Sequence, residues 1–265
     1  MLRFKQCQNI KVEESSVEEI IFKPDDYKWK TSITREYGIL NIKYSDFTQE
    51  EQNEIIKEAN NLLKNANPNS ANSNEYRSEI VRENDAFSGI LAEFAVVKLL
   101  NSIVPNSAYR PEVTSLKNQI DIYWLYNNIK YSIEVRSSFV KNGIEFALYA
   151  VNRETNKTYF DILGPYYQKY KVKYDVTKDI YARVLFNGQK SSVKERFIKN
   201  NESFYVIGFI SGSKLVGLNY KKLLKENSSI VSKYGKINGN YFVAPINEIM
   251  DVRKFKKNVN DRLAD

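Results

Sequence analysis

Apolar residues in the first half of the chain recur at the spacing of a helix. They do so from 48 to 64, and Thr48 followed three residues later by Glu51 forms a capping box that indicates where this helix begins. Before it, the stretch 1–44 has no dominant period, which favours an irregular cover. After it, residues 65–74 read NANPNSANSN, and this asparagine, serine and proline content predicts a loop.

A second helix is expected in the most apolar segment of the sequence. It begins with Asn84 or Asp85 as the cap and runs to about Ser102. Within its GILAEFAVVKLL stretch only Glu93 and Lys98 are polar. Burying an ionised carboxylate without a partner is costly, so Glu93 should be neutral, hydrogen-bonded or close to a cation. Two interpretations stay open: a pairing with a nearby Arg or Lys, or a reach towards the carboxylates described below.

Alternation of apolar and polar residues replaces the helical period after residue 118, and this period of two is typical of strands. We also expect a helix at 192–200, a short strand or turn at 215–220, turns at Gly208 and Gly212, and a solvated basic tail. The expected strands are 119–126, 129–137, 144–151, 159–163, 180–186 and 204–210.

The size and order of these elements indicate the fold class. The chain has 265 residues, of which 42% are hydrophobic. This is enough for one full core, or for one core with an appended lobe, and it excludes disorder of the whole chain. Helix, then hairpin and sheet, then mixed elements predict an α+β or α/β fold with a mixed central sheet flanked by helices. We expect an N-terminal cover with one helix over 1–73, a core over 74–220 and a basic extension over 221–265.

Charge and the rarest residue types narrow the chemistry. Lys plus Arg number 40 and Asp plus Glu number 32, so the net charge is +8, which favours a polyanionic partner, nucleic acid first. The chain has no histidine, which excludes Ser-His and Cys-His triads and histidine-bound metals. The single cysteine, Cys7, excludes an intramolecular disulfide and a cysteine-bound metal cluster. With no secretory signal and no uninterrupted membrane-length apolar segment, we expect a cytoplasmic protein.

A tight hairpin is expected around Asn127 and Asn128. Asn tolerates the positive φ that a two-residue type I′ turn requires, and residues at equal distances from the turn then face each other. One face is apolar and should be buried; it pairs Ile120 with Val135, Ile122 with Ile133, Trp124 with Tyr131, and Tyr126 with Ile129. The opposite face pairs Leu125 with Lys130, Tyr123 with Ser132, Asp121 with Glu134, and Gln119 with Arg136.

Two carboxylates, Asp121 and Glu134, thus meet on neighbouring strands. Like charges directly opposed destabilise a sheet by up to about 1 kcal/mol, so an offsetting charge is expected. A divalent cation provides it, since Mg²⁺ is typically held by one or two carboxylates with phosphate oxygens and water. Arg136, two residues after Glu134 on the same face, provides it too. In that second interpretation these are solvent-facing residues joined by a surface ion pair.

These residues, in this order, resemble the PD-(D/E)XK nuclease superfamily, which has the restriction-endonuclease-like fold. The resemblance covers residues 86–138. It rests on a glutamate in an apolar helix (GILAE, ending at Glu93), an aspartate opening a strand (QIDI, with Asp121) and a carboxylate-x-basic motif on the partner strand (IEVR, with Glu134 and Arg136).

The resemblance implies a role for each of these residues. Asp121, Glu134 and the backbone carbonyl of Val135 would hold Mg²⁺, with Mn²⁺ as a substitute. Arg136 would orient or stabilise the attacking hydroxide, and Glu93 would be an auxiliary ligand or orienting group.

The sequence departs from the family pattern at Arg136, where lysine is usual. Arginine cannot lose its proton in a protein and so cannot act as a base, but it can hold a phosphate and stabilise negative charge. Lys130 on the same face, or Lys141 just beyond the strand, is an alternative source of an ammonium group.

We therefore expect a Mg²⁺-dependent endodeoxyribonuclease of the restriction-enzyme class. It would hydrolyse DNA phosphodiester bonds without an organic cofactor or a membrane, and as a homodimer if it cuts both strands of a duplex. Two alternatives stay open. One is a catalytically inactive nucleic-acid-binding protein of the same fold, motivated by Arg136; the other is an interaction protein whose basic surface meets acidic proteins.

Overall fold

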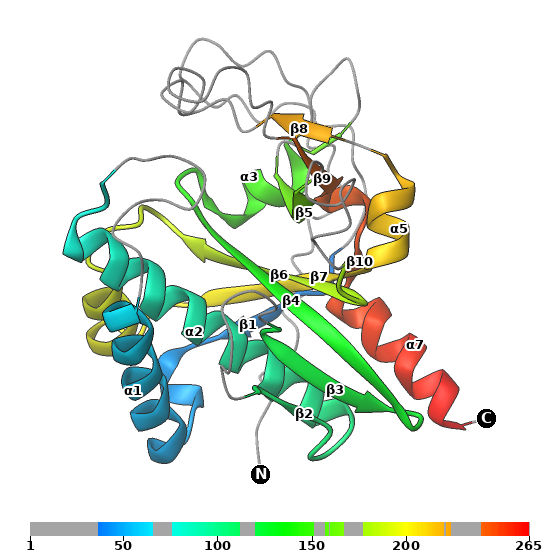
Figure 1. Cartoon of the computed structure of the whole chain (residues 1–265), viewed down its shortest axis with the longest axis horizontal. Helices are drawn as coiled ribbons and strands as arrows, with labels where there is room; N and C mark the ends of the chain where they lie inside the picture. The colour runs from blue at the N-terminus through cyan, green and yellow to red at the C-terminus, as the bar shows by residue number, and fades with distance from the viewer. Residues whose placement is uncertain are drawn as a thin grey trace, which may run out of the picture.

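The computed structural model of the chain describes residues 37–65, 76–111, 120–150, 157–158, 160–166, 177–219, 221–223 and 240–264. Figure 1 shows a curled mixed sheet with long helices on one side and a smaller sheet with short helices on the other. The expected mixed central sheet flanked by helices is confirmed. The loop expected at 65–74 lies, except for residue 65, outside the described residues, as does Gln119.

The main sheet has seven strands, of which β4 and β6 run parallel while the other neighbours are antiparallel. Its order is β1 (Leu40–Ile42), β7 (Phe204–Ser211), β6 (Ile180–Asn187), β4 (Ile129–Val140), β3 (Ile122–Tyr126) and β2 (Ala108–Tyr109), with β10 (Met250–Asp251) also paired to β7. The smaller antiparallel sheet has the order β5 (Asp161–Tyr166), β9 (Asn240–Pro245) and β8 (Lys221–Leu223).

The main sheet divides the core into two layers, each covered by helices. The first layer lies between the main sheet and the helices α1 (Gln49–Asn65), α2 (Glu79–Ile103) and α7 (Val252–Ala264). The second layer lies between the main sheet and α3 (Gly143–Tyr149), α5 (Gly212–Gly217) and the smaller sheet. Single turns complete the fold: η1 (Tyr44–Asp46), η2 (Glu195–Lys199) and η3 (Ile246–Glu248).

The start of α1 is as the sequence predicts. The backbone N–H of Thr48 donates to Glu51 Oε2 at 2.7 Å, and the N–H of Glu51 donates to Thr48 Oγ1 at 3.2 Å, which completes the capping box. Glu51 also accepts a hydrogen bond from the buried Nζ of Lys98 at 3.0 Å. This ion pair joins α1 to α2 and accounts for a lysine in the apolar helix.

The second helix is longer than expected. α2 begins at Glu79, and Ser78 caps it by accepting a hydrogen bond from the N–H of Val81, so the predicted caps at Asn84 and Asp85 are wrong. Asn84 lies instead in the core, where its Oδ1 accepts from the N–H of Val193. By length and composition alone α2 could cross a membrane, but most of it is buried inside the fold, as in the core helix of a globular domain.

One expected strand is a helix in the structure, and a segment expected as a short strand or turn begins inside another helix. Residues 144–151 were expected as a strand, but α3 occupies most of this segment because it belongs to the crossover between parallel strands β4 and β6, a connection usually made by a helix. Residues 215–220 begin within α5 rather than in a strand or turn. A short apolar run does not by itself distinguish helix from strand.

Both ends of the described chain join the main sheet. The expected irregular cover before Tyr44 contains β1, which pairs with β7. The expected solvated tail is helix α7, in which Val252, Phe255 and Val259 are buried while Arg253 and Lys254 are exposed. The apolar residues recur at spacings of three and four, and this face packs on the sheet.

Gly208 lies within β7 rather than in a turn. Its lack of a side chain lets β10 pack closely beside it. A Cβ at Gly208 would stand 2.1 Å from the carbonyl oxygen of Met250. We expect Gly208→Ala to lower the free energy of unfolding by about 1–3 kcal/mol, since β10 must shift. Gly89→Ala is the control: a Cβ there meets nothing within 4 Å, and its helix position predicts a gain of about 0.5–1 kcal/mol. Equal unfolding free energies of the two variants in urea would contradict this expectation.

Candidate active site

The hairpin of β3 and β4 has the register that the sequence predicts. Asn127 and Asn128 adopt φ angles of 49° and 60°, as a type I′ turn requires. The observed pairs are Ile122 with Ile133, Tyr123 with Ser132, Trp124 with Tyr131, Leu125 with Lys130, and Tyr126 with Ile129.

The apolar face of the hairpin is buried along most of its length. Ile120, Tyr131 and Val135 are half-buried, and Ile129 is 53% exposed. Its expected burial is wrong because β6 pairs with β4 only from Ile133 onward, so the tip of the hairpin has no third strand beside it. The buried residues of this face are Ile122, Trp124, Tyr126 and Ile133.

The strand ladder ends just before it reaches the two carboxylates. β3 begins at Ile122, so Asp121 lies one residue outside the strand, and its Oδ2 accepts a hydrogen bond from the N–H of Val135 at 2.8 Å. A side-chain bond thus takes the place of the expected ladder pair between Asp121 and Glu134. It fixes the Asp121 carboxylate against the residue that follows Glu134.

Asp121 and Glu134 interact electrostatically. Burial, followed by the charge of Glu134, raises the pKa of Asp121 to about 7, while the hydrogen bond from Val135 and the charges of Arg136 and Lys178 act in the opposite direction. Asp121 is therefore divided between its protonated and ionised forms near neutral pH. A cation beside the pair would favour the ionised form.

An ion pair joins Glu134 to Arg136, with 3.0 Å between Oε1 and Nη2. Arg183 on β6 lies beside Arg136 in the parallel ladder, and its Nη1 donates to the carbonyl oxygen of Arg136 at 3.3 Å and to Ser138 Oγ at 3.1 Å. Arg183 is only 4% exposed, and burial lowers its pKa to about 10. It supports the backbone that carries Arg136, a role that no sequence motif indicates.

Glu93 is held by a second arginine, Arg110. Arg110 Nε donates to Glu93 Oε2 at 2.7 Å, and its Nη1 bonds to Glu58 on α1. Burial raises the pKa of Glu93 well above its usual range, and the charges of Asp121 and Glu134 add to this effect. The ion pair with Arg110 opposes it. The pairing of Glu93 with a nearby arginine is therefore confirmed, and the charges of Asp121 and Glu134 also act on Glu93.

Sequence reasoning missed Arg110 because its partners are distant along the chain. Glu93 is 17 residues away and Glu58 is 52 residues away. Within the sequence Arg110 is a single basic residue with no periodic neighbours. Only the packing of α1 against α2 brings its two carboxylate partners together.

The structure also adds a lysine to the site. The charge of Lys178, in the segment before β6, acts on Asp121. Of the two lysines considered from the sequence, Lys130 lies 3.6 Å from the centre of the Tyr123 ring, and Lys141 is exposed beyond the end of β4. Lys178 is therefore the lysine whose positive charge acts on the Asp121 carboxylate and lowers its pKa.

The residues fit a metal site with two carboxylates better than one with three. In the described part of the chain, no group of three or more Asp, Glu, Cys or His residues is arranged to hold a metal ion. The N–H and C=O of one strand residue project to the same edge, so the carbonyl of Val135 faces Asp121 as its N–H does. Two carboxylates and one carbonyl suit Mg²⁺, which keeps several waters and takes further oxygens from a phosphate.

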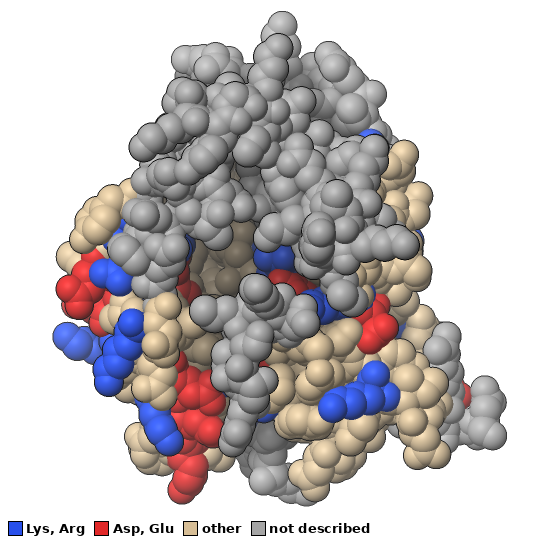
Figure 2. Space-filling model, viewed as in Figure 1, with Lys and Arg blue, Asp and Glu red and all other residues tan. Residues whose placement is uncertain are grey.

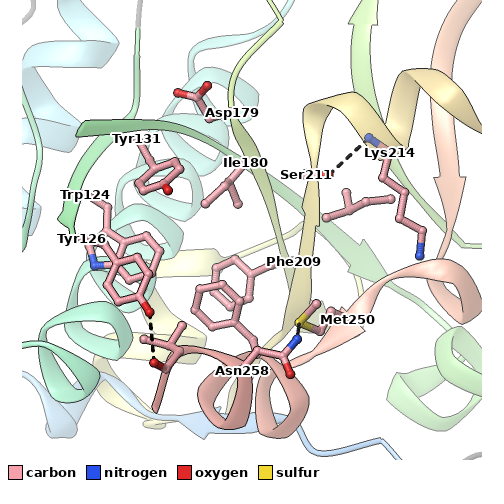
Figure 3. Close-up of a pocket in the computed structure, with 13 residues that line it drawn as sticks. Trp124, Tyr126, Tyr131, Asp179, Ile180, Phe209, Ser211, Lys214, Met250 and Asn258 are labelled. Carbon is pink, nitrogen blue, oxygen red and sulfur yellow. Dashed lines mark hydrogen bonds between the residues drawn. The ribbon is translucent and has the colours of Figure 1, made fainter. Parts of the chain in front are cut away.

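An apolar pocket of about 270 Å³ lies at the helix-covered side of the hairpin (Figure 3). Figure 3 shows Tyr131, Ile180 and Phe209 around it, with the Asp179 carboxylate at the rim. Its deeper polar groups already have protein partners: the Tyr126 hydroxyl donates to the carbonyl oxygen of Val259 at 3.0 Å. The four predicted site residues are absent from its lining, which includes Trp124, Tyr126, Tyr131, Ile180, Phe209, Met250 and Phe255. It is therefore separate from the carboxylate site.

Charges of both signs share the face seen in Figure 2. Among the described residues on that face, blue and red side chains lie next to each other rather than in one large basic field. Although the net charge of the chain is +8, the basic side chains on this face are interspersed with acidic ones. A polyanion would meet local basic groups on this face.

Comparisons of the chain with protein families, curated proteins and solved structures found no match.

Proposed function

We propose that this chain is a Mg²⁺-dependent endodeoxyribonuclease with a restriction-endonuclease-like core. The observation that supports this most is the position of Asp121 and Glu134 where the β3–β4 ladder ends, with Asp121 bonded to the backbone of Val135. The charges of both carboxylates act on Glu93 from the apolar helix. These observations support the proposal because the helix, the aspartate and the second glutamate follow one another in the order that the resemblance implies.

In the proposed mechanism the chain holds and orients the reacting groups. Asp121, Glu134 and the carbonyl of Val135 would hold Mg²⁺, which lowers the pKa of a water and stabilises charge on the scissile phosphate and the leaving oxygen. Arg136 would stabilise negative charge on the phosphate. Lys178, whose charge acts on Asp121, would donate a hydrogen bond to the attacking water.

The test is a cleavage assay with the full-length chain. It should cut DNA in Mg²⁺ or Mn²⁺, stop when EDTA is added and resume when Mg²⁺ is returned in excess, because the carboxylate pair needs a cation to hold the phosphate. Product analysis on a circular substrate separates internal cutting from digestion at ends. Cutting at the same rate in EDTA would contradict the metal-dependent mechanism.

The arginine at position 136 favours a second candidate, a nucleic-acid-binding protein without turnover. Its guanidinium is engaged by Glu134 and cannot act as a base. This candidate predicts salt-sensitive binding and no Mg²⁺-dependent product. An Arg136→Lys variant that gains cleavage where the wild type has none would support it, and cleavage by the wild type would exclude it.

A further inference from the structure

We infer that the outer face of the hairpin binds an unpaired nucleotide next to the carboxylate site, with its base on Tyr109 and its phosphate at Lys130. This surface, the hairpin patch, consists of Tyr109, Tyr123 and Lys130. It rests on the proposed function only in that the same nucleic-acid strand would continue to Asp121.

The three side chains form one continuous surface. Tyr109 on β2 is the strand partner of Tyr123 on β3, and their ring centres are 5.8 Å apart. Lys130 on β4 has its Nζ 3.6 Å from the centre of the Tyr123 ring and 5.7 Å from that of Tyr109. Tyr109 is 42% exposed, so a planar group has access to it.

The patch gives the two halves of a nucleotide separate partners. The Lys130 ammonium is held over Tyr123 by a cation–π contact, which positions a positive charge without neutralising it. A phosphate can therefore bind to Lys130, while the exposed ring of Tyr109 provides a face for the base. The distance from Lys130 to Tyr109 is one that a single nucleotide can span.

The patch lies on the same face of the sheet as the candidate site. Strand residues two apart point to the same side and directly opposed residues share a face, so Tyr123 lies on the same face as its partner Ser132. Glu134 and Lys130 share it on β4 by the same rule. A nucleic-acid strand that places a phosphate at the carboxylates and runs along the hairpin therefore reaches Lys130 and Tyr109.

The nucleotide must be unpaired. Inside a duplex both faces of each base are covered by neighbouring base pairs, and only the edges are open in the grooves. Stacking on an aromatic side chain requires a base that is not covered in this way. The substrate class is therefore DNA with a single-stranded stretch beside the position of cleavage.

Binding measured in EDTA tests the patch without cleavage. The probes are a labelled single-stranded oligodeoxynucleotide of mixed sequence and a blunt-ended duplex of the same sequence, with affinity read from fluorescence anisotropy. Tyr109→Ala should weaken single-strand binding roughly five- to a hundredfold and leave duplex binding unchanged. Tyr109→Phe, which keeps the ring, should bind as the wild type does. Lys130→Gln should reduce the slope of log affinity against log salt by about 0.7 for the single strand.

Tyr76→Ala is the matched control. Tyr76 is a more exposed tyrosine, at 74%, and it precedes α2, whose 25 residues separate it from β2 by about 37 Å at the helical rise. It should bind both probes as the wild type does. Unchanged single-strand binding by Tyr109→Ala, or an equal loss of duplex binding, would overturn the inference.

The inference and the proposed function fail separately. A wild type that binds single strands through Tyr109 but yields no product with Mg²⁺ supports the patch and overturns the nuclease. A wild type that cuts with Mg²⁺ while Tyr109→Ala binds and cuts a single strand equally well supports the nuclease and overturns the patch.

Discussion

Replacing Asp121 with asparagine is expected to lower the rate of Mg²⁺-dependent DNA cleavage at least about 10³-fold, because the loss of metal-mediated charge stabilisation costs several kcal/mol in the transition state. Asparagine keeps an oxygen that can accept the hydrogen bond from Val135 N–H. The fold should therefore remain intact. Single-turnover cleavage with saturating enzyme measures the effect on the chemical step.

The same substitution should stabilise the folded chain at high pH. The pKa of Asp121 is raised in the folded state to about 7, so the folded chain binds this proton more tightly than the unfolded chain does. Asp121 therefore lowers stability as the pH rises from about 4, its usual pKa, to about 7. At pH 8 Asp121→Asn should raise the melting temperature by about 2–4 °C for each kcal/mol relieved. At pH 4 the gain should be absent.

Asp85→Asn provides a control of the opposite sign. Asp85 forms ion pairs with Arg77 and Lys190 at the first half of α2, so its loss should lower the melting temperature slightly and leave cleavage unchanged. If Asp121→Asn cut DNA at the wild-type rate, its assignment to the metal would be wrong. If it lowered the melting temperature at pH 8, the buried charge of Asp121 would not be destabilising the folded chain.

Replacing Arg110 with alanine is expected to cost about 3–5 kcal/mol of stability, because it leaves a buried carboxylate without its cation. Glu93 and Arg110 are each only 14% exposed, and Glu58 loses the same partner. Protonation of Glu93 removes the uncompensated charge. The loss should therefore be largest at pH 8 and should shrink as the pH falls towards 5, a dependence that urea unfolding at each pH can measure.

Arg77→Ala separates this effect from the loss of any ion pair. Arg77 and Asp85 are 29% and 26% exposed, and such a pair contributes about 1 kcal/mol or less. The Arg110→Ala, Glu93→Leu double variant, which removes both charges, should be more stable than Arg110→Ala alone. A double variant no more stable than the single one would show that Arg110 acts through packing on Phe94, whose ring centre lies 5.0 Å from the guanidinium carbon.

Local interactions made part of this structure predictable. The capping box of Thr48 and Glu51 and the turn at Asn127 and Asn128 involve residues close together in the chain, so their chemistry determines their geometry. The register of β3 with β4 follows from that turn. The segment 144–151 was predicted wrongly because its helix depends on the parallel pairing of β4 with β6.

The sequence suggested candidate site residues but not the electrostatics around them. Residue types and hairpin register indicated Asp121, Glu134 and Arg136, and the apolar helix indicated Glu93. Arg110 and Arg183, which support Glu93 and Arg136, come from other elements and left no local pattern. Their roles depend on burial, and burial is a property of the assembled layers.

By itself the sequence determined where the helix α1 begins, the turn and register of the hairpin, and which face of the hairpin is apolar, because these depend on periodicity and turn chemistry over a few residues. The tertiary structure decided that Asp121 leaves the ladder to bond Val135, that Glu93 is held by Arg110, and that Lys178 acts on Asp121. Each of these depends on burial and on charges brought together from distant parts of the chain, and pKa values respond to both.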